Sequence, residues 1–184
     1  MKHRKMLLLA IAGALAGAVA VAPTPAAANA FPATMLADSS LHTYCYTAGF
    51  DTDQSIASYA MNTVLDGTTD MSDSFTAGNC ANVTIDVWWW EENLPGTTRG
   101  QWECVDEANA TTCDSADISI DYAQIDMGIN DWYDRRKTAV HEVGHSVGLG
   151  HDAISAMISG EVPSIGLVWR RYSPHDIAHI NANY

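Results

Sequence analysis

Residues 141–152 read His-Glu-Val-Gly-His-Ser-Val-Gly-Leu-Gly-His-Asp, and this stretch decides the local fold and the chemistry that we expect. An α-helix turns by about 100° per residue, so His141 and His145 lie about one turn apart on the same helix face. Two neutral imidazoles in that arrangement can bind one Zn²⁺ ion. The spacing therefore predicts a metal site built on a helix.

The neighbouring residues complete a longer pattern, H-E-x-x-H-x-x-G-x-x-H. Gly148 lets the chain leave the helix with a positive φ and so brings His151 back as a third ligand. Three protein ligands leave one position for water, as in catalytic zinc sites. Glu142 lies beside the first ligand and can take a proton from the zinc-bound water. H-E-x-x-H alone occurs by chance in ordinary helices, but the longer pattern fixes five positions, and we expect one catalytic zinc ion.

A methionine, Met157, follows the third histidine closely. The long zinc pattern followed by a methionine turn is the signature of metzincins, so the chain resembles this clan of zinc endopeptidases. The ending, residues 172–184, is similar to the last helix of matrixins, with Ser173 as N-cap and Pro174 at the first helical position. The chain thus resembles a small, secreted, bacterial, matrixin-like metzincin, and the specific resemblance covers about residues 135–184.

Some positions depart from the matrixin pattern. Asp152, directly after the third histidine, is typical of adamalysins. Ser159 stands where astacins and serralysins have a tyrosine zinc ligand, and His151 stands where snapalysins have aspartate. The interval from His151 to Met157 is short for a matrixin. These departures place the chain outside the well-known subfamilies.

The resemblance implies an α+β zincin/metzincin fold: a mixed twisted sheet, an active-site helix, and a small C-terminal subdomain that ends in a helix. Met157 would form an apolar floor beneath the imidazoles without binding zinc. A strand near Gln101–Cys104 would lie at the rim of the cleft and pair with extended substrate. The specificity pocket would lie between the active-site helix and residues 158–172. Cys45 lacks the Pro-Arg-Cys-Gly context of a matrixin cysteine switch, so we expect none.

The apolar pattern predicts the scaffold around this site. We expect a helix over 51–66 that is closed by Gly67, strands over 82–90, 100–105 and 117–122, the active-site helix over 134–148, an irregular stretch over 152–172, and a terminal helix over 174–183. Ile56, Tyr59, Ala60, Thr63 and Val64 have helical spacing. The run Trp88–Trp90 is interpreted as a strand that is part core and part surface, with a functional aromatic patch as the alternative.

The first 30 residues have the pattern of a secretory signal peptide. Three of the first five residues are Lys or Arg, an apolar run follows from Met6 to about Val21, and residues 28–30 form an A-x-A cleavage site. The apolar run is short and ends in a Pro/Ala segment, which disfavours a membrane anchor. We therefore expect residues 1–30 to be removed on export, and residues 31–184 to form one extracellular catalytic domain with no membrane partner.

Residues 31–184 are strongly acidic. They hold six Lys or Arg and 22 Asp or Glu residues, a formal net charge of −16, because three basic and no acidic residues precede Phe31. Nucleic acids are recognised by basic patches, so we exclude nucleic acid as a partner. Carboxylates can build Ca²⁺ sites, for which the candidate ligands are Asp114, Asp117, Asp121 and Asp126. The alternative is that these four aspartates form a solvated surface.

All four cysteines follow residue 30. An even number in an exported protein predicts two disulfides, with three possible pairings. We favour Cys45–Cys80, which ties the N-terminal arm to the entrance of a strand, and Cys104–Cys113, which closes a short loop between two expected strands. No C-x-x-C pair is present, which argues against zinc binding by cysteine.

These features predict a secreted, monomeric zinc endopeptidase that hydrolyses peptide bonds in peptide or protein substrates, with Glu142 as the general base. One alternative is a secreted zinc-binding interaction protein without proteolytic activity. Degenerate metzincins of that kind have lost the glutamate, whereas Glu142 is present. A second alternative, a carbohydrate-binding or surface module that uses the tryptophans, leaves the histidine spacing unexplained.

Overall fold

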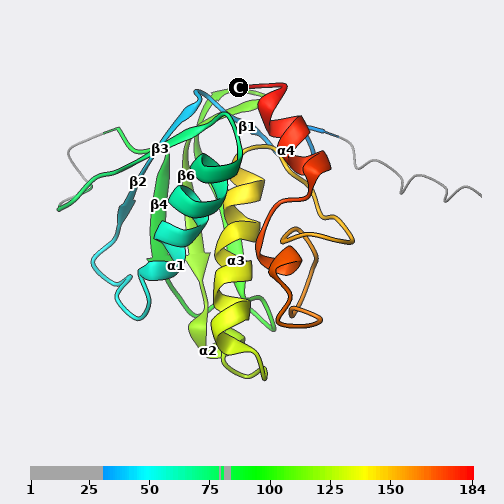
Figure 1. The fold of residues 1–184 in the computed structure, drawn as a ribbon. Helices are drawn as coiled ribbons and strands as arrows, with labels where there is room; N and C mark the ends of the chain where they lie inside the picture. The colour runs from blue at the N-terminus through cyan, green and yellow to red at the C-terminus, as the bar shows by residue number, and fades with distance from the viewer. Residues whose placement is uncertain (1–30, 79, 81–83) are drawn as a thin grey trace, which may run out of the picture.

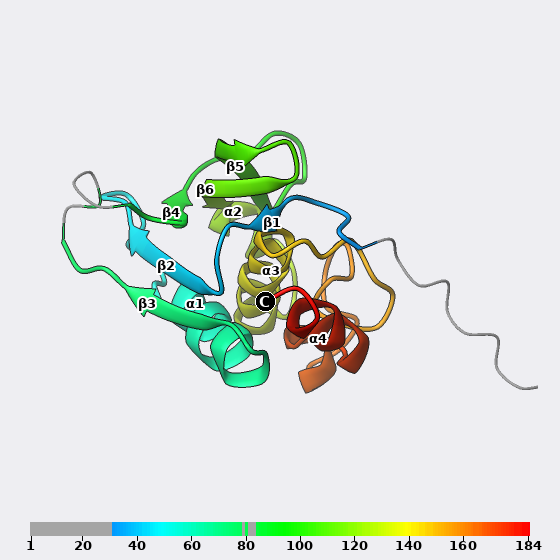
Figure 2. The same cartoon turned by 90° about the horizontal axis from the view of Figure 1, so that it is seen from above.

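The computed structural model describes residues 31–78, 80 and 84–184. The predicted signal peptide, residues 1–30, lies outside this range. A mixed, mostly parallel six-stranded sheet is covered on one face by helices, and α3 lies between the first helical segment and the C-terminal part of the chain (Figures 1 and 2). The mixed sheet and the terminal helix of the sequence prediction are therefore present.

The strands pair in the order β1-β6-β4-β2-β3, and β5 is added to β6. All neighbours are parallel except β5 and β6, which form an antiparallel hairpin. The strands are β1 (Leu36–Ala37), β2 (Leu41–Tyr46), β3 (Ser72–Phe75), β4 (Val87–Glu91), β5 (Gly100–Asn109) and β6 (Thr112–Ile120). Strand β5 thus contributes the antiparallel edge of the sheet, next to α3.

In Figure 1 the helices α1 and α3 lie side by side against the sheet. The helical segments are α1 (Ser55–Ser58), which continues as the π-helix η1 (Tyr59–Asp66), α2 (Tyr122–Ile125), α3 (Asp131–Ser146), the 3₁₀-helix η3 (Leu167–Arg170) and α4 (Pro174–Asn181). Ser173 caps α4 in a capping box with Asp176, which satisfies two otherwise unpaired backbone amides. The predicted N-cap of the terminal helix is therefore confirmed.

The first helix differs from its prediction in bounds and in the face that it buries. It begins at Ser55, and its second part has the wider π spacing. That spacing rotates the buried face relative to an α-helix, so Met61 and Leu65 are buried whereas Thr63 is exposed and Tyr59 is half-buried. A 3.6-residue period therefore assigned Thr63 to the wrong side.

Two of the predicted strands have different starts. Strand β4 begins at Val87, and residues 84–86 are not in a strand. The Asp86 carboxylate accepts hydrogen bonds from the backbone amide and the hydroxyl of Thr43, at 2.5 and 2.6 Å. The Thr43 amide in β2 is therefore paired with a side chain at this point and not with the backbone of a neighbouring strand. Strand β6 starts at Thr112, five residues before the predicted start, because the hairpin with β5 continues past Val105.

The predicted ends of two other elements also shift. Strand β6 ends at Ile120, because Asp121 instead caps α2 by accepting a hydrogen bond from the Gln124 amide at 3.0 Å. Helix α3 begins at Asp131, three residues before the predicted start, and two aspartates in its first turn favour the helix N-terminus. It ends at Ser146, two residues early, and the chain turns away at Gly148.

The core lies between the sheet and the layer formed by α1, η1 and α3. Its largest buried side chains include Trp89, Ile118 and Ile120 from the sheet, and Ile56, Met61 and Leu65 from α1 and η1. Trp89 is fully buried, whereas Trp88 and Trp90 are partly exposed. The tryptophan run is therefore a strand that is part core and part surface, as predicted.

Both predicted disulfides form. Cys45 in β2 is joined to Cys80 with a Cα–Cα distance of 6.0 Å, and Cys104 in β5 is joined to Cys113 in β6 with a Cα–Cα distance of 5.8 Å. The N-terminal arm that Cys45 anchors is itself a central strand.

No helix in the described part of the chain has the length and apolar character that a membrane span requires.

Candidate metal centre

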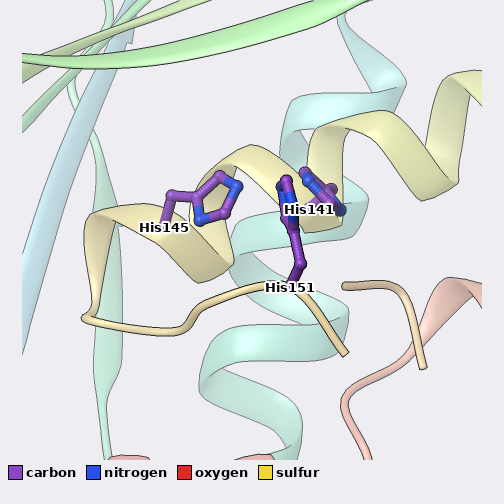
Figure 3. Close-up of side chains that lie close together, drawn as sticks. All are labelled: His141, His145 and His151. Atoms are coloured by element: carbon purple, nitrogen blue, oxygen red, sulfur yellow. The ribbon is translucent and has the colours of Figure 1, made fainter. Parts of the chain in front are cut away.

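Three histidines meet where α3 ends and the chain turns back. His141 and His145 come from consecutive turns of α3, and His151 comes from the loop that follows it (Figure 3). One ligand atom from each side chain lies within 4.8 Å of the other two. Within residues 31–78, 80 and 84–184, this is the only group of three or more His, Cys, Asp or Glu side chains so placed. The predicted ligand set is therefore brought together.

Each of the three imidazoles has a hydrogen-bonding partner at its Nδ1 atom. His141 Nδ1 lies 2.9 Å from the Ala156 carbonyl oxygen, and His145 Nδ1 lies 2.8 Å from the Leu149 carbonyl oxygen. A carbonyl oxygen only accepts, so both Nδ1 atoms carry the proton, and Nε2 keeps its lone pair for a metal. His151 Nδ1 lies 3.1 Å from the hydroxyl oxygen of Ser159. Metal-binding histidines are commonly fixed through their second nitrogen in this way.

Two glycines bring the third histidine and the methionine into place. Gly148 has φ +93°, and a Cβ there would lie 2.9 Å from Leu36 Cδ2. The predicted left-handed turn is therefore confirmed. Gly144 allows Met157 to pack against the α3 backbone, since a Cβ there would lie 2.3 Å from the Met157 sulfur. Met157 is fully buried on the helix, which fits the predicted apolar floor.

Burial keeps the ligand candidates in the form that binds metals. Desolvation, followed by the charge of Lys137, lowers the pKa of His141 to about 2. Desolvation also lowers the pKa of His145. Neutral imidazole is the form that coordinates a metal, so both side chains are ready to bind zinc near neutral pH. The three nitrogen donors and their hydrogen-bonded partners therefore fit a zinc ion.

Glu142 lies beside the histidines but is not part of their group. Its side chain is buried, and desolvation raises its pKa to about 7, against the opposing effects of Lys137 and a hydrogen bond from the backbone amide of Trp102 in β5. Strand β5 passes close to the carboxylate: a Cβ on Gly100 would lie 2.7 Å from Glu142 Oε1. A carboxyl group with this pKa can accept and return a proton near neutral pH.

An open cleft of about 740 Å³ exposes this chemistry to solvent. One wall comes from the start of β5 and the loop before it, with Arg99 and Gly100. The floor comes from α3, including Lys137, His141 and Glu142, and the other side comes from residues 159–161 after Met157. The cleft thus lies between β5 and the C-terminal part of the chain, and two of the three metal candidates, His141 and His151, line it.

Asp152 has a structural role beside the histidines, whereas the four predicted calcium ligands form no metal site. Asp152 stabilises the methionine turn, since its carboxylate accepts from the amides of Ala153 and Ile154 and its own amide donates to the Met157 carbonyl. Among the described residues, the calcium candidates form no group that could hold a metal ion: Asp121 caps α2, Asp126 pairs with Arg135, Asp114 lies near Asp38, and Asp117 lines a small cleft with Glu92 and Glu103. The structure does not bring these four carboxylates together.

Three contributors to the site were missed in the sequence. They are Gly144, which admits Met157, the amide of Trp102, which hydrogen-bonds Glu142, and Lys137, which lines the cleft. A glycine inside a helix is itself a signal of close packing, so Gly144 could have been found. The other two depend on how β5 crosses α3, which no local pattern encodes.

The comparisons with known proteins yield no relative that would assign a function. No protein-family model matches the chain, and no curated protein matches it. The metzincin resemblance therefore rests on the residues of the motif and on the geometry described above.

Proposed function

We propose that this protein is a secreted, zinc-dependent endopeptidase of the metzincin type with a matrixin-like ending. The observation that carries the proposal is the convergence of His141, His145 and His151 next to a cleft that Glu142 lines together with His141 and His151. Chance placement of an H-E-x-x-H sequence on a helix accounts neither for the third histidine nor for the polar partner that each ring has at Nδ1. The two disulfides are consistent with an oxidising, extracellular location.

The three imidazoles would hold the metal through Nε2, and zinc held there supplies the Lewis acidity that activates water and polarises a peptide carbonyl. Glu142 accepts the proton of the attacking water at a carboxylate oxygen and returns it to the leaving amine. Its buried position beside β5 raises its proton affinity into the useful range. The hydrogen bond from the Trp102 amide favours the carboxylate form and so partly offsets the effect of burial on the pKa of Glu142.

Strand β5 can bind an extended peptide. It pairs with β6 along one side, and most of its residues are exposed. A substrate strand that adds to the edge nearest the cleft would gain backbone hydrogen bonds and present a peptide bond to Glu142. Recognition of this kind reads the backbone more than the side chains, which suits an endopeptidase. It also fits the predicted rim strand, which the structure extends from Gly100 to Asn109.

Metal content and peptide cleavage test the proposal together. Protein stripped with a strong chelator and reloaded should bind about one zinc per chain, and hydrolysis of a quenched peptide should disappear and return with the metal. His145→Ala should lose most of the zinc because it removes one of three ligands. Cleavage at full rate by metal-free protein would end the proposal, and zinc binding without any cleavage would favour the interaction protein instead.

A further inference from the structure

The cleft wall beside the candidate metal centre carries a cation without a counter-ion in contact. Lys137 lies one helical turn before His141 and is only 4% exposed. It is the only lysine in residues 31–184. Among the described residues, the ion pairs closer than 4.0 Å involve Arg99 and Arg135 but not Lys137, and no hydrogen bond of its amine is found. Lysines that are this buried are almost always paired.

The charged groups that act on Lys137 make other contacts, although one oxygen of Asp134, Oδ2, has no hydrogen-bond partner. Arg99 forms an ion pair with Glu161 across the cleft. Asp134 accepts a hydrogen bond from the Val162 amide at 2.7 Å. The carboxylate of Glu142 accepts from the Trp102 amide. These groups influence the Lys137 ammonium through space, but none satisfies its hydrogen-bonding capacity.

Lys137 lines the cleft, so the space that substrate would fill is where its ammonium can find a partner. Burial lowers its pKa to about 8, opposed by Glu142 and Asp134, so the side chain remains mostly protonated at pH 7. The hydroxyl-bearing Thr98 and Thr138 line the same cleft and can donate further hydrogen bonds. A carboxylate entering here would gain a charge-assisted hydrogen bond.

We propose that Lys137 forms an anion subsite that selects peptides by a carboxylate, supplied either by an acidic side chain near the cleaved bond or by the C-terminus of the substrate. This inference rests on the proposed peptidase function and adds its substrate class. The remainder of the molecule is acidic, with a formal net charge of −16 over residues 31–184, so general attraction cannot produce such a preference. The preference must come from this local cation.

Matched substrates separate the two sources of the carboxylate. One series of quenched peptides carries Glu, Gln or Leu at each position around the cleaved bond, and a second pair differs only in a free or amidated C-terminus. We expect wild-type kcat/KM to favour the carboxylate member of one set by about ten- to a hundredfold, the usual range for a hydrogen bond to a charged group. Preference within the first series identifies a side chain, and preference within the pair identifies the terminus.

The variants show whether Lys137 is responsible. Lys137→Met should abolish the preference, so that kcat/KM becomes equal for the carboxylate peptide and its neutral partner. The ratio within the pair is the readout, because Lys137 also lowers the pKa of Glu142 and its loss can change the rate for both peptides. Lys137→Gln gives the same test if the first variant does not fold. Arg171→Met is the matched control, because it removes one positive charge from an exposed position and should keep the preference. Equal wild-type cleavage of all matched partners, or a preference within the pair that Lys137→Met leaves unchanged, would overturn the subsite.

Failure of the peptidase proposal has a separate signature. If zinc-loaded protein cleaves no peptide, the same peptides are measured by binding, using fluorescence anisotropy with zinc-loaded wild type and Lys137→Met. Tighter binding of the carboxylate member, lost in Lys137→Met and retained in Arg171→Met, supports the subsite without any turnover. Equal binding of the matched peptides rejects it.

Discussion

Replacing Gly148 with alanine should weaken both the fold and the metal site. The residue has φ +93°, and a left-handed conformation costs an L-residue with a side chain roughly 1–2 kcal/mol. The new Cβ would also lie 2.9 Å from Leu36 Cδ2 and 3.1 Å from Phe31 Cζ, and overpacking of this kind costs about 1–3 kcal/mol. We therefore expect a loss of about 2–5 kcal/mol in the free energy of unfolding of metal-free protein.

The turn at Gly148 also positions His151, so zinc affinity should fall. Loss of support for a ligand typically costs about 10- to 100-fold in metal affinity. Denaturant unfolding of the metal-free protein and a competitive zinc titration measure the two effects. Gly96→Ala is the matched control: its φ is +67° and a Cβ there meets nothing within 4 Å, so it should lose only the backbone term and keep its zinc affinity. Unchanged zinc affinity in Gly148→Ala would refute this account of the turn.

Three further predictions concern the scaffold and the ligand support. Removing the disulfide Cys45–Cys80, whose cysteines are 35 residues apart, should lower the free energy of unfolding by about 4 kcal/mol. Removing Cys104–Cys113, with a separation of 9, should lower it by only about 2.5 kcal/mol, because the shorter loop restricts the unfolded chain less. Equal losses in denaturant unfolding would contradict this loop-entropy reasoning. Burial lowers the pKa of His42 to about 4, so as the pH falls below about 6.5 the unfolded chain takes up a proton that the folded chain does not. The free energy of unfolding should therefore decrease between about pH 6.5 and pH 4, by up to about 1.4 kcal/mol per pH unit. His42→Asn should flatten the plot of stability against pH in this range. Ser159→Ala removes the hydroxyl that lies 3.1 Å from His151 Nδ1, and it should lower the zinc affinity by about tenfold in a chelator competition. An unchanged zinc affinity would show that Ser159 does not support His151.

The metal centre could be predicted from the sequence because its geometry is local. His141 and His145 share a helix face, and Gly148 indicates the turn that brings His151 close to them. The disulfide pairing could be predicted for a similar reason, since Cys104 and Cys113 flank one hairpin. In each case a short stretch of chain contains the whole argument.

The features that escaped prediction depend on tertiary packing. Strand β2 contains His42, which is buried because it reaches Ser146 on α3 at 2.9 Å, and no alternation of apolar residues reveals that pairing. The π-helical segment moved Thr63 to the surface against its 3.6-residue period. No local pattern singles out Lys137, because its place in the cleft depends on how β5 and residues 159–161 lie beside α3.

Glu142→Ala tests whether this site hydrolyses peptide bonds with Glu142 as its general base. Glu142 is not one of the grouped ligand candidates, so the variant should retain about one zinc per chain and its fold. General-base assistance is typically worth about 10²–10⁴ in rate, so hydrolysis of a quenched peptide should fall by that factor, with a small residual rate from the metal. A variant that keeps its zinc and cleaves at close to the wild-type rate would contradict the account.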